Sequence, residues 1–248
     1  MIEIKYADKI CRFDDEGVDP EHPGTMYGPM IQGRFYEHAF LDYIASLEIP
    51  GTYVDVGACI GTHTVFFALY CPSGRVYAFE PRSVQMRRLR RNVELNQVHG
   101  RVIASEWALS DRKGRVEVSL DRRNHVLRTR RLDTLVREPV AVIKLDVEGM
   151  EAQALGGARR MLRRYRPRVF AEAHTEEDVA RILAVLEPYG YRATGRVFNA
   201  SPTYEFVASR RADSRGKVAM RRAVHATPAP VKRMLPNGVR RLARRALR

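Results

Sequence analysis

The sequence has no run of about 18 apolar residues, so we expect no helix that spans a membrane. Residues 1–13 alternate apolar and polar side chains and lack the continuous apolar core of a secretory signal. Cysteine is scarce, and the spacing of Cys11, Cys59 and Cys71 fits no zinc site. These absences predict a cytoplasmic protein in a reducing compartment, without a disulfide framework.

Positive charge is concentrated in the C-terminal tail. The chain has 248 residues and a formal net charge of +14. Residues 209–248 hold 13 Lys and Arg against one acid, a balance of +12, and residues 1–208 hold 30 basic and 28 acidic residues, a balance of +2. The argument that a basic protein binds nucleic acid therefore applies to the tail and not to the body.

The tail has two interpretations. Three prolines between 228 and 236 interrupt any long helix. After Asn237, apolar residues fall on one helical face and arginines cover the rest. The pattern fits a disordered tail, or a short basic amphipathic helix that holds the protein peripherally at an anionic membrane surface.

Strand and helix patterns alternate through residues 51–208, which we take as one domain. Strands are expected at 52–57, 75–80, 101–107, 140–146 and 168–173, and helices at 61–70, 82–96, 149–165 and 175–188. This order predicts a Rossmann-like α/β fold with a mostly parallel sheet. Two last strands, 191–197 and 203–208, would add an antiparallel strand at the sheet edge, and a small hairpin is expected at 115–120 and 126–131.

Residues 1–50 form the N-terminal part. The sequence predicts a hairpin over 1–13 that turns at Ala7 and Asp8, and a Pro- and Gly-rich loop over 15–34. Residues 35–47 place their apolar side chains on one helical face and predict a helix that leads into the domain.

A glycine-bearing turn follows the first strand of the domain and opens a helix, which lets a nucleotide cofactor approach the backbone. The next strand ends at Glu80, where an acid would accept hydrogen bonds from ribose hydroxyls. The expected cofactor contacts of the two strand ends are Asp55, Gly57, Ala58, Gly61, Thr62, Glu80 and Pro81.

The turn favours one nucleotide over another. In a dinucleotide fingerprint, a middle glycine lets a pyrophosphate come close. Here Cys59 stands between the two glycines, and Asp55 would repel phosphates. S-adenosylmethionine has no phosphate, and an acid favours its ammonium group. The turn therefore predicts S-adenosylmethionine; the alternative is a Rossmann-like fold whose loop binds no nucleotide.

The third strand ends in Ala108-Leu109-Ser110-Asp111, a position that should border the adenine. Ser110 or Asp111 could bond the exocyclic amine, and Ala108 or Leu109 could offer a backbone amide. The same residues are also an ordinary strand-to-turn signal.

Three ionisable residues end the fourth and fifth strands. Asp146 ends one strand, and Glu172 and His174 end its neighbour on the same side. We expect these three residues to converge as a catalytic group. His174 could act as a general base, or all three residues could hold a divalent cation such as Mg²⁺.

Several segments resemble the FkbM family of methyltransferases. They are 54–62, Phe79-Glu80-Pro81 and 143–151, the last being the most specific. The resemblance covers about residues 33–208 and implies a class I methyltransferase fold with a seven-stranded sheet. It also implies contacts from Tyr36 or Glu37 to the methionine end, and O-methylation of a sugar, glycan or natural-product hydroxyl.

Two other functions stay open. The basic tail suggests a nucleic-acid N-methyltransferase, although the acidic segment after the fourth strand would repel phosphates. The other is a non-catalytic protein that binds S-adenosylmethionine.

Overall fold

The computed structural model describes residues 1–22, 24–120 and 123–209. Beyond Ser209 the basic tail lies outside the described residues, so both interpretations of it stay predictions. Arg122 of the small hairpin is outside them as well. Within the described ranges, no helix is both long enough and apolar enough to cross a bilayer.

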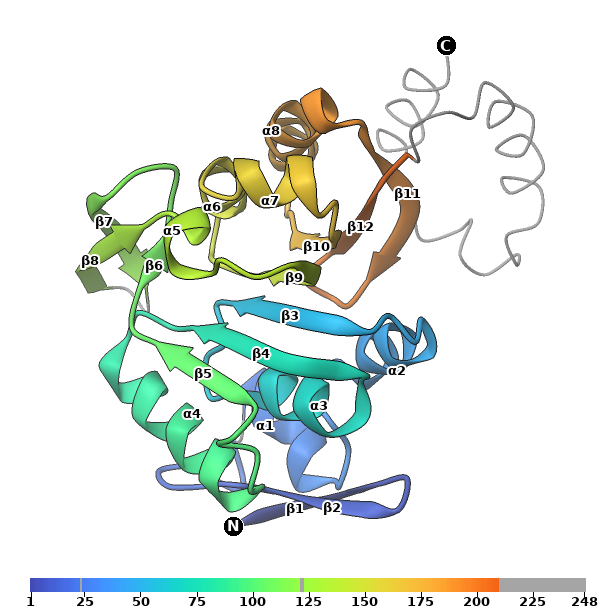
Figure 1. Ribbon diagram of the computed structural model, residues 1–248. Helices are drawn as coiled ribbons and strands as arrows, with labels where there is room; N and C mark the ends of the chain where they lie inside the picture. The colour runs from blue at the N-terminus through green and yellow to red at the C-terminus, as the bar shows by residue number, and fades with distance from the viewer. Residues whose placement is uncertain (23, 121–122, 210–248) are drawn as a thin grey trace.

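A seven-stranded sheet forms the centre of the molecule (Figure 1), in the order β11-β12-β10-β9-β3-β4-β5. The parallel strands are β3 (Gly51–Val56), β4 (Ser73–Phe79), β5 (Val102–Ser105), β9 (Val140–Leu145) and β10 (Arg168–Glu172). β12 (Thr203–Ala208) runs antiparallel to both β10 and β11 (Tyr191–Phe198). The predicted mostly parallel sheet is confirmed, with its antiparallel strand one place inside the edge.

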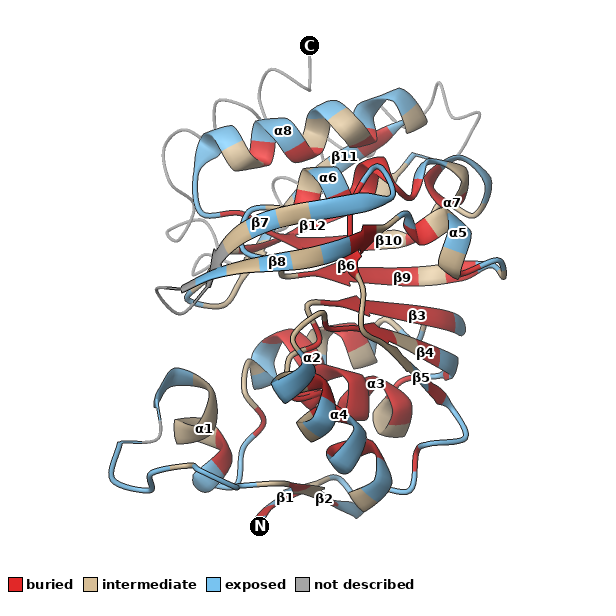
Figure 2. Cartoon of the chain, turned by 90° about the vertical axis from the view of Figure 1, so that its left-hand side faces the viewer, coloured by how far each residue is buried: buried red, intermediate tan, exposed pale blue. Residues whose placement is uncertain are grey.

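Helices cover both faces of this sheet, whose strands are largely buried (Figure 2). One layer holds α2 (His38–Ser46), α3 (Thr62–Tyr70) and α4 (Ser83–Leu95), and the other holds α6 (Glu151–Gly156), α7 (Arg159–Arg164) and α8 (Glu176–Leu186), followed by the 3₁₀ turn η1 (Glu187–Tyr189). Neighbours along β3 show why two cores form: Tyr53 belongs to the first and Val54 to the second, because strand side chains alternate.

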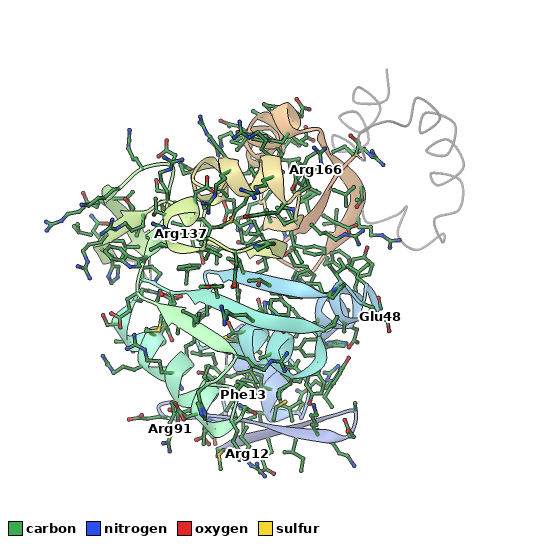
Figure 3. All side chains as sticks on the ribbon, viewed as in Figure 1. Arg12, Phe13, Glu48, Arg91, Arg137 and Arg166 are labelled. Atoms are coloured by element: carbon green, nitrogen blue, oxygen red, sulfur yellow. The ribbon has the colours of Figure 1, made fainter. Side chains whose placement is uncertain are left out.

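The N-terminal hairpin pairs β1 (Ile2–Tyr6) with β2 (Lys9–Phe13) and turns at Ala7, as predicted. Phe13 is buried, while Arg12 forms an ion pair with Glu3 on the other face (Figure 3). The prediction of a loop over 15–34 was wrong in part, because α1 (Gly24–Ile31) forms within it. Burial of Met30 in the first core outweighs the poor helix propensity of that segment.

A small sheet stands at the carboxyl edge of the large one. It consists of β6 (Ala108–Leu109) and the predicted hairpin β7 (Gly114–Leu120) and β8 (Arg123–Arg130), in the order β6-β8-β7. The expected single helix over 149–165 is wrong, because α6 ends at Gly156 and α7 starts anew. Asp133, in α5 (Leu132–Leu135), accepts hydrogen bonds from the backbone amides of Arg160 and Met161 at the start of α7. The chain therefore restarts a helix where a side chain satisfies its first amides.

Candidate active site

The turn after β3 brings the ends of three parallel strands together. Gly57 has φ 75, and a Cβ there would lie 1.7 Å from the carbonyl oxygen of Asp146. The amides of Gly57 and Ala58 donate to the carbonyl oxygen of Phe79 at 2.9 and 3.0 Å. Position 57 therefore admits no side chain, and its backbone is open to a ligand at the carboxyl edge of the sheet.

A cleft of ≈ 190 Å³ opens along this edge. Among the predicted cofactor residues, the following line it: Gly57, Glu80, Pro81, Ala108, Leu109 and Asp146. Ala58 and Gly61 are buried in the turn, and Thr62 is buried at the start of α3. The Ser110 hydroxyl lies 3.2 Å from Asp111. The structure thus brings the ends of β3, β4 and β9 to one elongated site, with β6 beside them.

Glu80 has a nearly complete set of partners within the chain. Its carboxylate accepts the amides of Cys59 at 3.0 Å and Arg82 at 2.9 Å, and the Arg82 Nε at 3.0 Å. Only 3% of its side chain is exposed. Arg82 had no role in the sequence analysis. It fixes the orientation of the acid that we expect to meet ribose hydroxyls.

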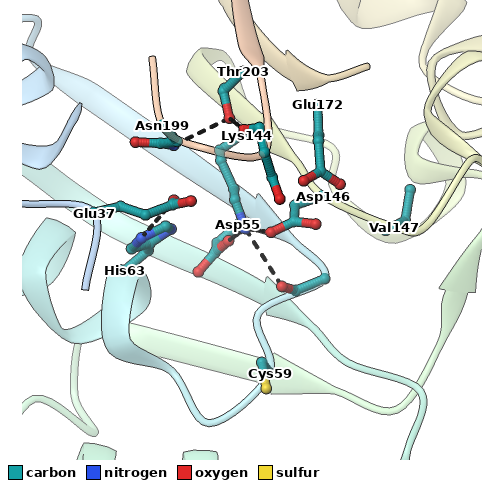
Figure 4. Close-up of polar contacts among 12 residues, drawn as sticks. Glu37, Asp55, Cys59, His63, Lys144, Asp146, Val147, Glu172, Asn199 and Thr203 are labelled. Atoms are coloured by element: carbon teal, nitrogen blue, oxygen red, sulfur yellow. Dashed lines mark hydrogen bonds and ion pairs between the residues drawn. The ribbon is translucent and has the colours of Figure 1, made fainter. Parts of the chain in front are cut away.

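Lys144 is the centre of a buried charge cluster (Figure 4). Its Nζ lies 3.5 Å from Asp55 Oδ1, 3.4 Å from Asp146 Oδ2 and 3.4 Å from the Gly57 carbonyl oxygen. Burial opposes the charged form of Lys144, but the carboxylates of Asp146, Asp55 and Glu37 raise its pKa above the usual value. The Thr64 hydroxyl donates to Asp55 at 2.6 Å. Asp55 is fully buried, so the predicted effect of Asp55 on a cofactor ammonium would have to pass through this network.

Glu37 and His63 form a second buried pair beside the cluster (Figure 4). The His63 Nε2 lies 3.4 Å from the Glu37 Oε2, and the Tyr36 ring stacks on the imidazole with centroids 6.2 Å apart. Burial raises the pKa of Glu37 to about 7 and lowers that of His63 to about 4. Tyr36 and Glu37 therefore reach the charged end of the site, although they do not line the cleft.

Asp146, Glu172 and His174 converge, as predicted. Asp146 and Glu172 lie next to each other (Figure 4), and His174 Nε2 lies 3.4 Å from Glu172 Oε2. Burial and the Asp146 charge raise the pKa of Glu172. Burial disfavours the charged form of Asp146, but the Lys144 ammonium lowers its pKa. The His174 side chain is 52% exposed, so it faces solvent.

The metal-binding alternative finds no support in this geometry. Within the described ranges, no three His, Cys, Asp or Glu side chains are arranged to hold a metal ion. The neighbouring acid Glu151 has a structural role, because it accepts the amides of Val147 at 3.0 Å and Gly149 at 3.3 Å at the start of α6.

Sequence reasoning missed Lys144 and His63. Lys144 precedes Asp146 by two residues, and the period of a strand therefore puts both side chains on one side of β9. That spacing was a signal that could have identified Lys144. His63 had no comparable signal, since its contact with Glu37 joins residues 26 positions apart through the packing of α2 on α3.

The sheet order, the turn after β3 and the acids at the ends of β3, β4 and β9 define a class I methyltransferase domain. The model for the methyltransferase FkbM domain matches residues 55–193. This match spans more than half of the 248 residues, so the chain belongs to the FkbM methyltransferase family, and the resemblance seen in the sequence is confirmed. Membership implies S-adenosylmethionine as the cofactor.

Two solved structures share the fold. One is a methyltransferase FkbM from Methylobacillus flagellatus KT, with 22% identity and a TM-score of 0.50. The match covers 64% of this chain and 43% of that one, so this chain spans less than half of that protein. The other is an S-adenosylmethionine-dependent O-methyltransferase from Thermotoga maritima, with 14% identity, a TM-score of 0.50, and coverage of 71% and 67%. No curated protein matches the chain.

The residues present fit the implied cofactor. The side-chain-free backbone at Gly57 accommodates its close approach, and Glu80 stands where ribose hydroxyls would be accepted. Asp55, Asp146 and Glu37 outnumber the single cation Lys144, so the cluster has carboxylates to balance an added ammonium and sulfonium.

Proposed function

We propose that this domain transfers a methyl group from S-adenosylmethionine to a hydroxyl of a sugar, glycan or natural-product acceptor. The observation that supports this is the pairing of His174 with Glu172 beside Asp146, which itself lines the cofactor cleft. A partly exposed imidazole at this place can meet an acceptor from solvent.

An aliphatic hydroxyl needs help to lose its proton near pH 7. The pKa of Glu172 is raised, and the positive charge of the cofactor would lower it again. The ionised Glu172 then favours the His174 tautomer with its proton on Nε2, which leaves Nδ1 to accept the hydroxyl proton. The cofactor supplies an electrophilic methyl group when bound. The rest of the acceleration comes from holding the acceptor oxygen in line with that group, an effect worth up to roughly 7–11 kcal/mol.

The test combines turnover with a matched pair of variants. The full chain is incubated with S-adenosylmethionine and a panel of glycosides, and S-adenosylhomocysteine is measured. We expect His174→Ala to lower kcat by roughly 10²–10⁴-fold. The control is His99→Ala, because His99 also lies beside an acid, Glu94, at 3.6 Å, on the surface. Equal turnover in His174→Ala and the control would show that His174 is not the general base.

Two further arms test the alternatives. Turnover that falls with EDTA and returns with Mg²⁺ would favour metal ligation by Asp146, Glu172 and His174, whereas we expect no change. Methylation of RNA or DNA in place of glycosides would favour the nucleic-acid alternative. Cofactor binding without any S-adenosylhomocysteine formed, across the panel, would favour a non-catalytic protein.

A further inference from the structure

A second cleft lies beside the cofactor cleft, on the hairpin of β7 and β8. It encloses ≈ 350 Å³ and is lined by Trp107 and four cationic side chains, Lys113, Arg115, Arg128 and Arg130. Trp107 lines both clefts. We call this second site the basic cleft.

The two faces of the hairpin line different clefts. Val118 and Leu127 line the cofactor cleft. Arg128 and Arg130 lie at alternate positions of β8 and therefore share the opposite face, where the basic cleft lies. Arg115 is the direct cross-strand partner of Arg128. Like charges at such a pair destabilise a hairpin unless something neutralises them.

The protein offers these cations little neutralisation. Among the described residues, no carboxylate lies within ion-pair distance, 4.0 Å, of Lys113, Arg115, Arg128 or Arg130. The guanidinium carbons of Arg128 and Arg130 lie 4.7 and 4.8 Å from the Trp107 ring centroid. The Arg130 Nε is buried and has no hydrogen-bond acceptor in the described part of the chain. The aromatic ring therefore holds two guanidinium groups in place without supplying them a negative charge.

We propose that the basic cleft binds a phosphoryl group carried by the acceptor. Planar guanidinium groups bind phosphoryl oxygens with paired hydrogen bonds. A phosphate monoester or diphosphate carries two or more negative charges, whereas a carboxylate would neutralise only one of four cations. The volume suits a small ligand. Identifying this ligand with the acceptor rests on the proposed function, and the shared Trp107 places it beside the cofactor.

The chain contains one tryptophan, so Trp107 reports binding directly. The full chain is titrated with inorganic pyrophosphate at fixed ionic strength, by fluorescence and by calorimetry. We expect a saturable change in wild type and at least tenfold weaker binding in the double variant Arg128→Gln/Arg130→Gln. The matched control Arg87→Gln/Arg91→Gln removes the same charge from exposed positions of α4, of which Figure 3 labels Arg91, and should bind within twofold of wild type. No saturable binding, or equal weakening in both variants, would overturn the proposal.

Four further ligands define the chemical class that the basic cleft binds. A hexose phosphate should compete with pyrophosphate, and the unphosphorylated hexose and a hexuronate should not. Tighter binding of a single-stranded oligonucleotide than of pyrophosphate would overturn the proposal in favour of a nucleic-acid surface. Competition by the hexuronate equal to that by the phosphate would overturn the preference for phosphoryl groups.

Calorimetry with S-adenosylmethionine separates this proposal from the proposed function. The Arg128→Gln/Arg130→Gln variant should retain cofactor affinity within about threefold, because neither arginine lines the cofactor cleft. A chain that binds pyrophosphate but no cofactor would refute the methyltransferase function and the acceptor assignment, and would leave an anion site. A chain that binds cofactor but no pyrophosphate would refute the basic cleft alone.

Discussion

The two ends of the cofactor cleft hold their carboxylates in different ways. At the β4 end, Glu80 accepts three N–H groups from Cys59 and Arg82, and its side chain is 3% exposed. At the β9 end, Asp146 is 34% exposed, and several carboxylates share the single cation Lys144. One end is fixed by hydrogen bonds, whereas the other holds acids whose ionisation depends on their neighbours.

We propose that the two ends hold different parts of the cofactor. Ribose hydroxyls are neutral and need a directed acceptor, which the Glu80 end supplies. The methionine part is cationic, and the Lys144 end supplies excess negative charge. The raised pKa values of Glu37 and Glu172 mean that these acids hold protons that added positive charge would release. The predictions below test this comparison, from the largest expected effect to the smallest.

Lys144→Met should produce the largest loss. It leaves Asp55 and Asp146 without their cation, and breaking a buried ion pair from one side costs about 3–5 kcal/mol. Chemical denaturation at pH 7 measures the free energy of unfolding. The control Lys5→Met removes an exposed charge of β1 and should change it by less than about 0.5 kcal/mol. A similar small effect in both variants would show that the cluster is not held by Lys144.

Gly57→Ala tests the turn after β3, where the Glu80 end and the Lys144 end of the cofactor cleft meet. The added Cβ would lie 1.7 Å from the Asp146 carbonyl oxygen in a φ 75 backbone, so we expect about 3 kcal/mol of destabilisation and loss of cofactor binding. Gly17→Ala is the matched control, since Gly17 has φ 71 and no atom within 4 Å of the new Cβ. It should cost about 1 kcal/mol, the backbone strain alone. If the two variants lost the same free energy of unfolding, the close approach of the Asp146 carbonyl oxygen would not be the reason why position 57 requires glycine.

Glu37→Gln tests whether ionisation at the Lys144 end depends on folding. The pKa of Glu37 rises from 4.5 to about 7 in the folded protein. Its contribution to stability is therefore fully present below pH 4.5 and is lost as pH rises through 7, because the folded state binds more protons. Relative to wild type, the variant should gain on the order of 3 kcal/mol between pH 4.5 and 8.

His63 contributes a slope of opposite sign to this measurement. Its pKa falls from 6.5 to about 4 on folding, so its contribution is complete above pH 6.5 and is lost as pH falls through 4. In wild type the two slopes oppose each other between pH 4.5 and 6.5. Glu37→Gln should therefore expose a rise of stability with pH in that window. If the free energy of unfolding depended on pH in the same way in wild type and in Glu37→Gln, the raised pKa that we assign to Glu37 would be wrong.

Glu80→Gln should have the smallest effect. The amide keeps one acceptor oxygen for the Cys59 and Arg82 donors but loses the charge that strengthens hydrogen bonds. We expect cofactor affinity to fall about tenfold, about 1.4 kcal/mol, by calorimetry. Glu138→Gln, at an acid paired with Arg75 away from the cleft, should leave affinity unchanged. If Glu80→Gln weakened cofactor binding more than Gly57→Ala does, the expectation that the Glu80 variant has the smallest effect would be wrong.

Much of the site could be read from local patterns. Gly57, Glu80 and Asp146 each end a strand, and parallel strands end at one edge, so their convergence followed from the order of elements. The capping box of α8, in which Thr175 and Asp178 satisfy each other's amides, joins residues only three positions apart and is therefore also a local pattern. The contacts of His63 and Arg82 did not, since the first depends on the packing of two helices and the second on a rotamer.

The amino-acid sequence determined the α/β class, the cofactor turn and the three strand ends, because hydrophobic period and glycine placement act over a few residues. Tertiary structure decided that Lys144 neutralises Asp55 and Asp146, that α1 forms around Met30, and that one face of the β7–β8 hairpin gathers cations over Trp107. These features depend on which elements pack together and how far water is excluded. A local spacing such as that of Lys144 and Asp146 puts two side chains on one side of a strand but does not determine their burial or their partners on other elements.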